Sequence, residues 1–159
     1  MWNRGVRRRI GQRGGKKGKI PYSPLCLLSL INPVFIHMRR SDHRKMIIWQ
    51  NIDNLDILVQ EILKYIPKHE FKTRSQIDNA SDSIGSNFVE GYYSDSLGEY
   101  IRFEKYAKRS LAELQERVRR IFRKGFINEK LLERFDDLSI KTMYLFDKLI
   151  SALEKLQNK

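Results

Sequence analysis

The chain has almost none of the residues that metal centres and covalent catalysis require. Its 159 residues include one cysteine, Cys26, which excludes an intrachain disulfide and a cysteine metal cluster and fits a reducing cytoplasm. None of the three histidines lies on a predicted helix at the Glu-x-x-His spacing of a bundle metal site. A glycine-rich phosphate loop and a Gly-x-Ser-x-Gly elbow are also lacking. We therefore expect no enzymatic activity, no metal, no cofactor and no small-molecule substrate.

Long hydrophobic runs are lacking as well. The apolar stretch LCLLSLI at residues 25–31 is far shorter than the roughly 20 residues that span a bilayer. No window alternates apolar and polar residues with the period of two that strands show. These absences favour an all-α protein with no membrane partner.

Positive charge is abundant, but it is unevenly distributed. The formal net charge is +12, and residues 1–45 alone hold 12 basic residues and one acid, a net charge of +11. Residues 46–159 hold 19 basic and 18 acidic residues, a net charge of +1. The high isoelectric point therefore describes the N-terminal segment, and it says little about the predicted domain at 46–159.

Residues 1–45 are interpreted as a basic leader that precedes the domain. The stretch 3–19 is basic and glycine-rich without hydrophobic periodicity, which predicts disorder. Three interpretations of the leader are open: a solvated tail that touches RNA, a secretory signal or anchor, or a segment foreign to the native protein. No small-x-small cleavage site follows the apolar stretch, which disfavours the signal. Under the third interpretation, translation starts at Met38 or Met46.

Four segments with helical periodicity follow the leader. We expect helices over 46–66, 74–92, 97–124 and 129–157, because apolar residues recur in each at steps of three and four. Short loops between four long helices give antiparallel neighbours. The sequence therefore predicts an antiparallel up-down-up-down four-helix bundle.

Capping signals mark the ends of these segments. Pairs of Thr73 with Gln76 and of Ser96 with Glu99 have the spacing of a capping box. Asn128 is a suitable N-cap for the fourth helix. Pro67 is expected to end the first helix, and Gly125 to end the third.

The fourth predicted helix carries more apolar surface than one bundle core needs. One stripe holds the residues Leu131, Phe135, Leu138, Thr142, Leu145, Leu149, Ala152 and Leu156. A second stripe beside it holds Leu132, Met143, Phe146 and Ile150. Because a core-facing stripe spans a little over 100°, we expect the second stripe to form an oligomer interface.

The third predicted helix is the basic element of the domain. Residues 101–124 carry a net charge of +6, whereas residues 46–100 carry −5. Five cations lie opposite the apolar face of this helix and are predicted to contact nucleic-acid phosphates: Arg102, Lys105, Arg109, Arg120 and Arg123.

A solvated face with local ion pairs is the alternative interpretation of this helix. Pairs of Glu113 with Arg117 and of Glu116 with Arg120 stand at the favoured i, i+4 spacing. The acidic half of the domain, 46–100, is a further source of neutralising charge. Tyr92, Tyr93 and Tyr106 can stack on bases, although packing is the commoner role for such rings.

Polar residues border the apolar stripe of the second predicted helix. Asn87 and Glu90 are expected to be half-buried and to form a structural polar clasp, with Glu90 paired to an arginine such as Arg102. The serines of segment 81–86 have no base to activate them, and we interpret them as small packing residues.

Several of these residues carry a family resemblance. The chain resembles the 23S rRNA intervening-sequence proteins, also called S23-type four-helix-bundle proteins, over roughly 46–155. The matching motifs are SQI at 75–77, SNFVEG at 86–91, EYIRF at 99–103 and SLAEL at 110–114. The chain departs from the family pattern at Gly85, where the family usually has proline, and at Val89, where it has alanine.

The resemblance implies a small bacterial cytoplasmic protein that assembles as a homopentamer. The family is similar to the accessory variability protein of diversity-generating retroelements, a partner of a reverse transcriptase and its RNA. We therefore hold two hypotheses. The first is a non-enzymatic oligomeric scaffold that binds RNA or a nucleic-acid-processing protein through the third helix. The alternative is a protein-interaction module that forms a ring and binds no nucleic acid.

Overall fold

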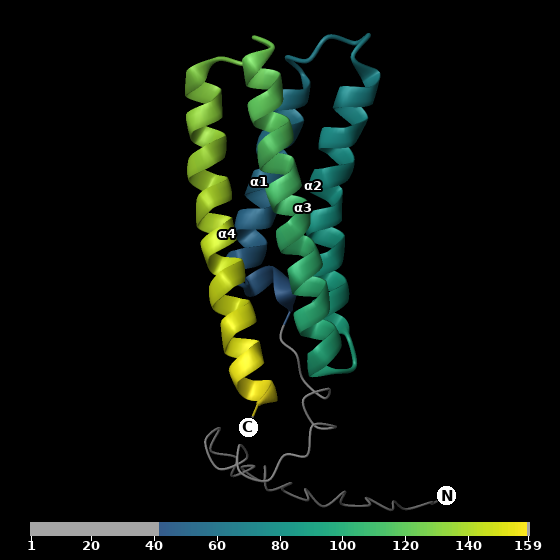
Figure 1. Cartoon of the computed structure of the whole chain (residues 1–159), viewed down its shortest axis with the longest axis vertical. Coiled ribbons are helices and arrows are strands. Elements are labelled where there is room, and N and C mark those ends of the chain that lie inside the picture. Colours follow the sequence, from purple (N-terminus) through teal and green to yellow (C-terminus); the bar gives the residue numbers. More distant parts are fainter. Residues whose placement is uncertain (1–41, 159) are drawn as a thin grey trace, which may run out of the picture. The chain divides into compact units, whose positions relative to one another are not determined.

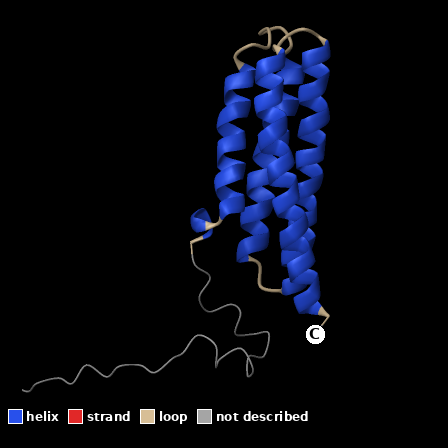
Figure 2. Cartoon of the chain, turned by 90° about the vertical axis from the view of Figure 1, so that its left-hand side faces the viewer, coloured by secondary structure: helices blue, strands red, loops and turns tan. Residues whose placement is uncertain are grey.

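The computed structural model describes residues 42–158, which form a four-helix bundle. Its elements are η2 (His43–Lys45), α1 (Ile47–Leu63), α2 (Phe71–Tyr93), α3 (Leu97–Arg123) and α4 (Glu129–Gln157). The four α-helices run alternately in opposite directions along one axis (Figure 1). The described part of the chain contains no strand (Figure 2). The predicted all-α antiparallel bundle is therefore confirmed.

The core lies along the centre of the bundle and receives side chains from every helix. Each α-helix packs against the next, and α1 also packs against α4, which closes the bundle. The apolar residues that recur at steps of three and four in the first two predicted helices are all buried: Ile48, Ile52, Leu55, Val59, Ile62 and Ile66, and Ile77, Ala80, Ile84 and Phe88. Each aliphatic or aromatic side chain buried in this way contributes about 1.5–3 kcal/mol to stability. Ten large core residues are Leu55, Ile62, Ile77, Ile84, Phe88, Leu111, Leu114, Ile121, Phe135 and Phe146.

The ends of α3 and α4 follow the predicted capping signals. The side chain of Ser96 accepts a hydrogen bond from the backbone N–H of Glu99 at 3.1 Å. The side chain of Asn128 accepts one from the backbone N–H of Leu131 at 2.9 Å. Gly125 follows α3 with a φ of 74°, a left-handed conformation that residues with a Cβ rarely adopt.

The predicted start of α2 is wrong. The helix begins at Phe71, three residues before the predicted start, so Thr73 lies inside it and not at its cap. The hydroxyl of Thr73 donates to Glu70 Oε2 at 2.8 Å. The guanidinium of Arg74 donates to the backbone oxygens of Leu63 and Ile66. Arg74 thus satisfies carbonyl groups at the end of α1, which stops before Pro67 is reached.

The assignment of Phe146 and Ile150 to an oligomer interface is also wrong. Phe146 is fully buried and Ile150 is 7% exposed within a single chain, so a second subunit cannot reach either side chain. The buried face of α4 runs diagonally between the two predicted stripes, through Leu131, Phe135, Ser139, Thr142, Phe146, Ile150 and Leu153. Leu132 and Met143 are partly buried against the same core.

The described part of the chain begins slightly before the predicted domain boundary. His43 Nδ1 lies 2.9 Å from the hydroxyl of Tyr93, and its ring is edge-on to Trp49 with centroids 4.6 Å apart. Asp42 accepts hydrogen bonds from Arg44, which lower the pKa of the Asp42 carboxyl to about 2. The rest of the predicted leader, with Cys26 and the proposed start at Met38, lies outside the described residues.

None of the described helices is long and apolar enough to cross a membrane.

Candidate nucleic-acid interface

The basic residues predicted to contact phosphates all lie on α3 and are exposed. The capped start at Ser96 fixes the register of this helix, and its apolar stripe faces the core. Because the cations occupy the opposite side, they reach solvent over the whole length of α3. The exposed residues are Arg102, Lys105, Arg109, Arg120 and Arg123.

Three of these five cations are paired with acids. Lys105 Nζ lies 2.6 Å from Glu154 Oε1 on α4. Arg123 donates to Glu116 at 2.9 Å, and this bond is the main cause of the lowered pKa of the Glu116 carboxyl. Arg102 makes a longer contact with Glu99, at 3.4 Å. An exposed pair of this kind contributes little to stability, but it reduces the positive charge presented to a polyanion.

Arg109 and Arg120 differ from the other three cations in that they form no ion pair with a described residue. Neither has an acidic side chain within ion-pair distance among residues 42–158. The guanidinium of Arg109 lies over the ring of Tyr106, with Cζ 5.7 Å from the ring centroid. The predicted pair of Glu116 with Arg120 is wrong, because Glu116 bonds Arg123 two turns further along. The predicted pair of Glu113 with Arg117 is confirmed, with Nε and Oε1 2.9 Å apart.

Acids of α4 supply most of the neutralising charge across the bundle. Besides Lys105, two further cations of α3 face α4: Lys108 pairs with Asp147, and Arg119 lies 3.7 Å from Asp136. The acidic segment that contains α1 and α2 contributes less: Glu70, the N-cap of α2, pairs with Lys124 at 2.9 Å, and the neutral Gln76 accepts a hydrogen bond from Arg117. Sequence proximity does not reveal these pairs, because they depend on how α3 and α4 lie against each other.

The three tyrosines that were candidates for base stacking lie in different environments. Tyr92 is buried and stacked on Phe88, with centroids 6.2 Å apart, so it is a core residue. Tyr93 is exposed at the end of α2 and contacts His43. Tyr106 is exposed on α3 beside Arg109. Only Tyr106 combines an exposed ring with a neighbouring unpaired cation.

The polar clasp is not formed as predicted. The amide nitrogen of Asn87 donates to Ser83 within α2, and the hydroxyl of Ser83 meets that of Ser110 on α3 at 2.9 Å. Glu90 is exposed, and Arg102 pairs with Glu99 instead. Near Asn87, α2 and α3 are therefore joined by the hydrogen bond between the hydroxyls of Ser83 and Ser110, and not by the predicted pair of Glu90 with Arg102.

The buried acid of this region is Glu104, which the sequence interpretation missed. Its side chain is fully buried, and neither carboxyl oxygen has a hydrogen-bond partner. Loss of hydration raises the pKa of the Glu104 carboxyl to about 9. A signal was present in the sequence: Glu104 follows Tyr100 by four residues and precedes Ala107 by three, which is stripe spacing.

Helices α2 and α3 lie close together where the Glu104 carboxyl is buried. A methyl group at Gly91 would lie 2.9 Å from Phe103 Cβ and 3.2 Å from Glu104 Oε1. The backbone of α2 therefore lies directly against the Glu104 side chain, and only glycine leaves room for it. Because Gly91 has no side chain, α2 places no polar group here that could hydrogen-bond to the Glu104 carboxyl.

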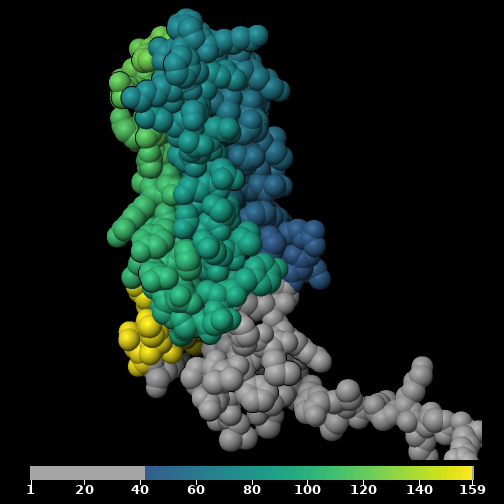
Figure 3. Space-filling view, turned by 90° about the vertical axis from the view of Figure 1, so that its right-hand side faces the viewer, coloured from purple at the N-terminus to yellow at the C-terminus, as the bar shows by residue number. Residues whose placement is uncertain are grey.

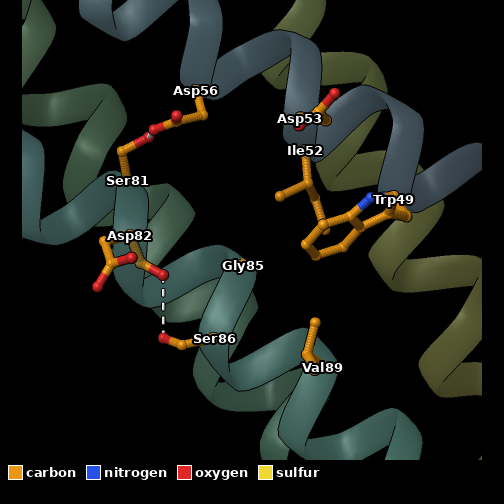
Figure 4. Close-up of a pocket in the computed structure, with 9 residues that line it drawn as sticks. All are labelled: Trp49, Ile52, Asp53, Asp56, Ser81, Asp82, Gly85, Ser86 and Val89. Atoms are coloured by element: carbon orange, nitrogen blue, oxygen red, sulfur yellow. Dashed lines mark hydrogen bonds between the residues drawn. The ribbon is translucent and has the colours of Figure 1, made fainter. Parts of the chain in front are cut away.

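An acidic hollow of about 360 Å³ lies between α1 and α2, which run side by side on the face shown in Figure 3. Asp53, Asp56 and Asp82 line it together with Trp49 (Figure 4). Asp56 Oδ1 accepts a hydrogen bond from Ser81 Oγ at 2.9 Å. The negative charge of these carboxylates makes this face unfavourable for RNA, in contrast to the exposed Arg109 and Arg120 on α3.

A metal-binding cluster is absent from the described residues, and three serines of α2 are engaged in hydrogen bonds. Within residues 42–158, no three His, Cys, Asp or Glu side chains are grouped so that they could hold a metal ion. The serines of segment 81–86 bond to Asp56, to Ser110 and to the backbone oxygen of Asp82. They stabilise contacts within and between helices.

Comparison with known protein families identifies a match. A family model described as 23S rRNA-intervening sequence protein matches residues 44–148, which include all of α1, α2 and α3 and most of α4. No curated protein matches the chain. The description of the matched family names no enzymatic activity.

Proposed function

The chain belongs to the family of 23S rRNA-intervening sequence proteins, and we propose that it is a non-enzymatic scaffold that binds RNA through α3. The observation that carries the proposal is the pair of unpaired, exposed arginines, Arg109 and Arg120. They stand 11 residues apart, which is three turns and roughly 16 Å along the helix axis. Both guanidiniums therefore face the same side and can contact separate phosphates of one strand.

The ion pairs of Lys105, Arg123 and Arg102 distinguish these residues from Arg109 and Arg120 within the predicted RNA-binding surface. Lys105 and Arg123 must give up Glu154 and Glu116 before they can bind a phosphate. Arg109 and Arg120 need give up no acid, so their contact with RNA releases counterions at no loss of an internal pair. Arg102, with its long contact to Glu99, is intermediate.

Replacing Arg109 and Arg120 together with glutamine is expected to weaken binding of a labelled RNA roughly tenfold or more at low salt. The matched control replaces Lys105 and Arg123 with glutamine, which removes the same charge from the same helix but only from paired positions. We expect the control to bind within about threefold of the native chain, because its cations already have partners. Fluorescence anisotropy with the full chain measures both. Equal losses in the two variants would show that α3 acts only through net charge and would overturn the assigned residues.

Self-association is a second candidate function, and a specific surface favours it. Ile140 and Tyr144 of α4 are exposed, and with Asn51 of α1 they line an almost wholly apolar groove of about 470 Å³. Ile57 of α1 is also an exposed aliphatic residue, although it does not line this groove. Exposed apolar surface of this kind is typical of protein interfaces. We propose that a second copy of the chain covers it, as the family resemblance implies.

Light scattering of the full chain tests this candidate. The native mass is expected to be a multiple of the chain mass, and Ile140→Glu is expected to reduce it towards the monomer, because a carboxylate cannot be buried unpaired at the contact. Leu156→Glu is the matched control, since Leu156 is equally exposed on α4 but does not line the groove. A native monomer would reject self-association and leave the RNA proposal standing.

A further inference from the structure

Two arginines flank two aromatic side chains over about two turns of α3, from residue 102 to residue 109. The guanidinium of Arg102 lies over the ring of Phe103, with Cζ 5.3 Å from the centroid. The ring of Phe103 is edge-on to that of Tyr106, with centroids 6.1 Å apart and planes at 89°. The guanidinium of Arg109 lies over Tyr106. These four residues, the arginine–aromatic row, form one continuous series of contacts.

The Tyr106 ring, on which a ligand could stack, is exposed to solvent. The side chain of Tyr106 is 40% exposed, while Phe103 is half-buried and holds the Tyr106 ring in place from one side. Arg109 has no acidic partner in the described part of the chain, so its guanidinium can contact a phosphate while its plane remains beside the ring. An exposed ring supported by a rigid helix and flanked by free cationic charge is a platform for a flat aromatic ligand that carries negative charge.

We propose that the arginine–aromatic row binds unpaired nucleotides of RNA, with a base stacked on Tyr106 and the adjoining phosphate bonded by Arg109. This inference rests on the proposed RNA-binding function and adds its substrate class, single-stranded in preference to duplex RNA. Base faces are available for stacking only where the strand is unpaired. A duplex offers α3 chiefly phosphates, and Arg109 and Arg120 are the only arginines of α3 that have no acidic partner among residues 42–158.

Fluorescence anisotropy distinguishes the two forms of RNA. The probes are a labelled single strand of about 12 nucleotides of mixed sequence and the same strand in a blunt duplex. The full chain is expected to bind the single strand more tightly at equal salt. Tyr106→Leu is expected to weaken binding of the single strand by about 5- to 150-fold, the value of one stacked base, and to leave duplex binding unchanged. Tyr106→Phe retains the ring and is expected to bind like the native chain.

Tyr65→Leu is the control, because Tyr65 is also an exposed tyrosine but lies just after α1, outside the arginine–aromatic row, and its loss is expected to have no effect. Equal affinity for strand and duplex, with no effect of Tyr106→Leu, would overturn the inference and leave the proposed function intact. If neither RNA binds at low salt, the proposed function fails and the inference fails with it. A change in oligomeric mass in Tyr106→Leu without a change in RNA affinity would identify the row as a protein contact and also overturn the inference.

Discussion

Glu104→Gln is expected to raise the free energy of unfolding by about 3–5 kcal/mol at pH 8. The Glu104 carboxyl is fully buried without a partner, and its pKa is raised to about 9. At pH 8 the unfolded chain exposes an ionised carboxylate, whereas the folded chain must keep the group protonated. Glutamine has nearly the same shape and is neutral at every pH, so it removes this difference.

The same group predicts how stability depends on pH. The folded pKa of about 9 is above the ordinary value of 4.5, so the folded chain holds a proton that the unfolded chain has released between these values. The stability contributed by this proton is fully present below pH 4.5, and about 1.4 kcal/mol is lost for each unit as the pH rises towards 9. Glutamine at residue 104 is expected to flatten this slope. Denaturant unfolding followed by circular dichroism from pH 5 to 9 measures it.

Glu90→Gln provides the control, because Glu90 lies on the neighbouring helix and is exposed. It removes one carboxylate without changing the core, and we expect the native slope to remain. If Glu104→Gln keeps the native slope as well, another group is responsible for the pH dependence and Glu104 is hydrated in solution.

Phe146→Ala is expected to lower the free energy of unfolding by about 3–5 kcal/mol, because it leaves a cavity among the largest core side chains. Phe146 is fully buried and edge-on to Phe88 of α2, with ring centroids 6.4 Å apart. Urea unfolding of the native chain and the variant gives the difference. The matched control is Tyr144→Ala, which removes an exposed ring two residues earlier and is expected to change the stability of the subunit little.

This pair of variants separates the core from the interface on α4. A stable Phe146→Ala subunit whose oligomeric mass has fallen would return Phe146 to the interface assigned from the sequence. Loss of stability in Phe146→Ala, with an altered mass only in Tyr144→Ala, would place the interface on the apolar groove.

The helices themselves could be predicted because local patterns determine them. The stripe through Ile52, Leu55 and Val59 already indicates which face of α1 is buried, and the caps at Ser96 and Asn128 depend on residues three positions apart. The buried face of the fourth helix was harder to predict. Apolar residues nearly encircle part of α4, so periodicity alone did not distinguish Phe146 and Ile150 from surface residues.

Which cations of α3 are neutralised by acids could not be predicted from the sequence, because it depends on how the helices pack. Lys105 and Glu154 are far apart in sequence and meet only because α3 and α4 are antiparallel and in register. Long side chains also choose among several partners, as when Glu116 bonds Arg123 and leaves Arg120 unpaired. Segment 101–124 therefore carries a net charge of +6 in its sequence, but only two of its arginines, Arg109 and Arg120, have no acidic partner among residues 42–158.

The dependence of RNA affinity on salt tests the role of these two arginines most directly. Each phosphate contact to a single strand contributes about 0.7 to the slope of log affinity against log salt. The full native chain and the Arg109→Gln, Arg120→Gln double variant share the same leader, so the difference between their slopes reports α3 alone. We predict a difference of about 1.4, with the native chain the more salt-dependent. Identical slopes, or no binding by the native chain at low salt, would contradict the proposal that α3 is an RNA-binding surface.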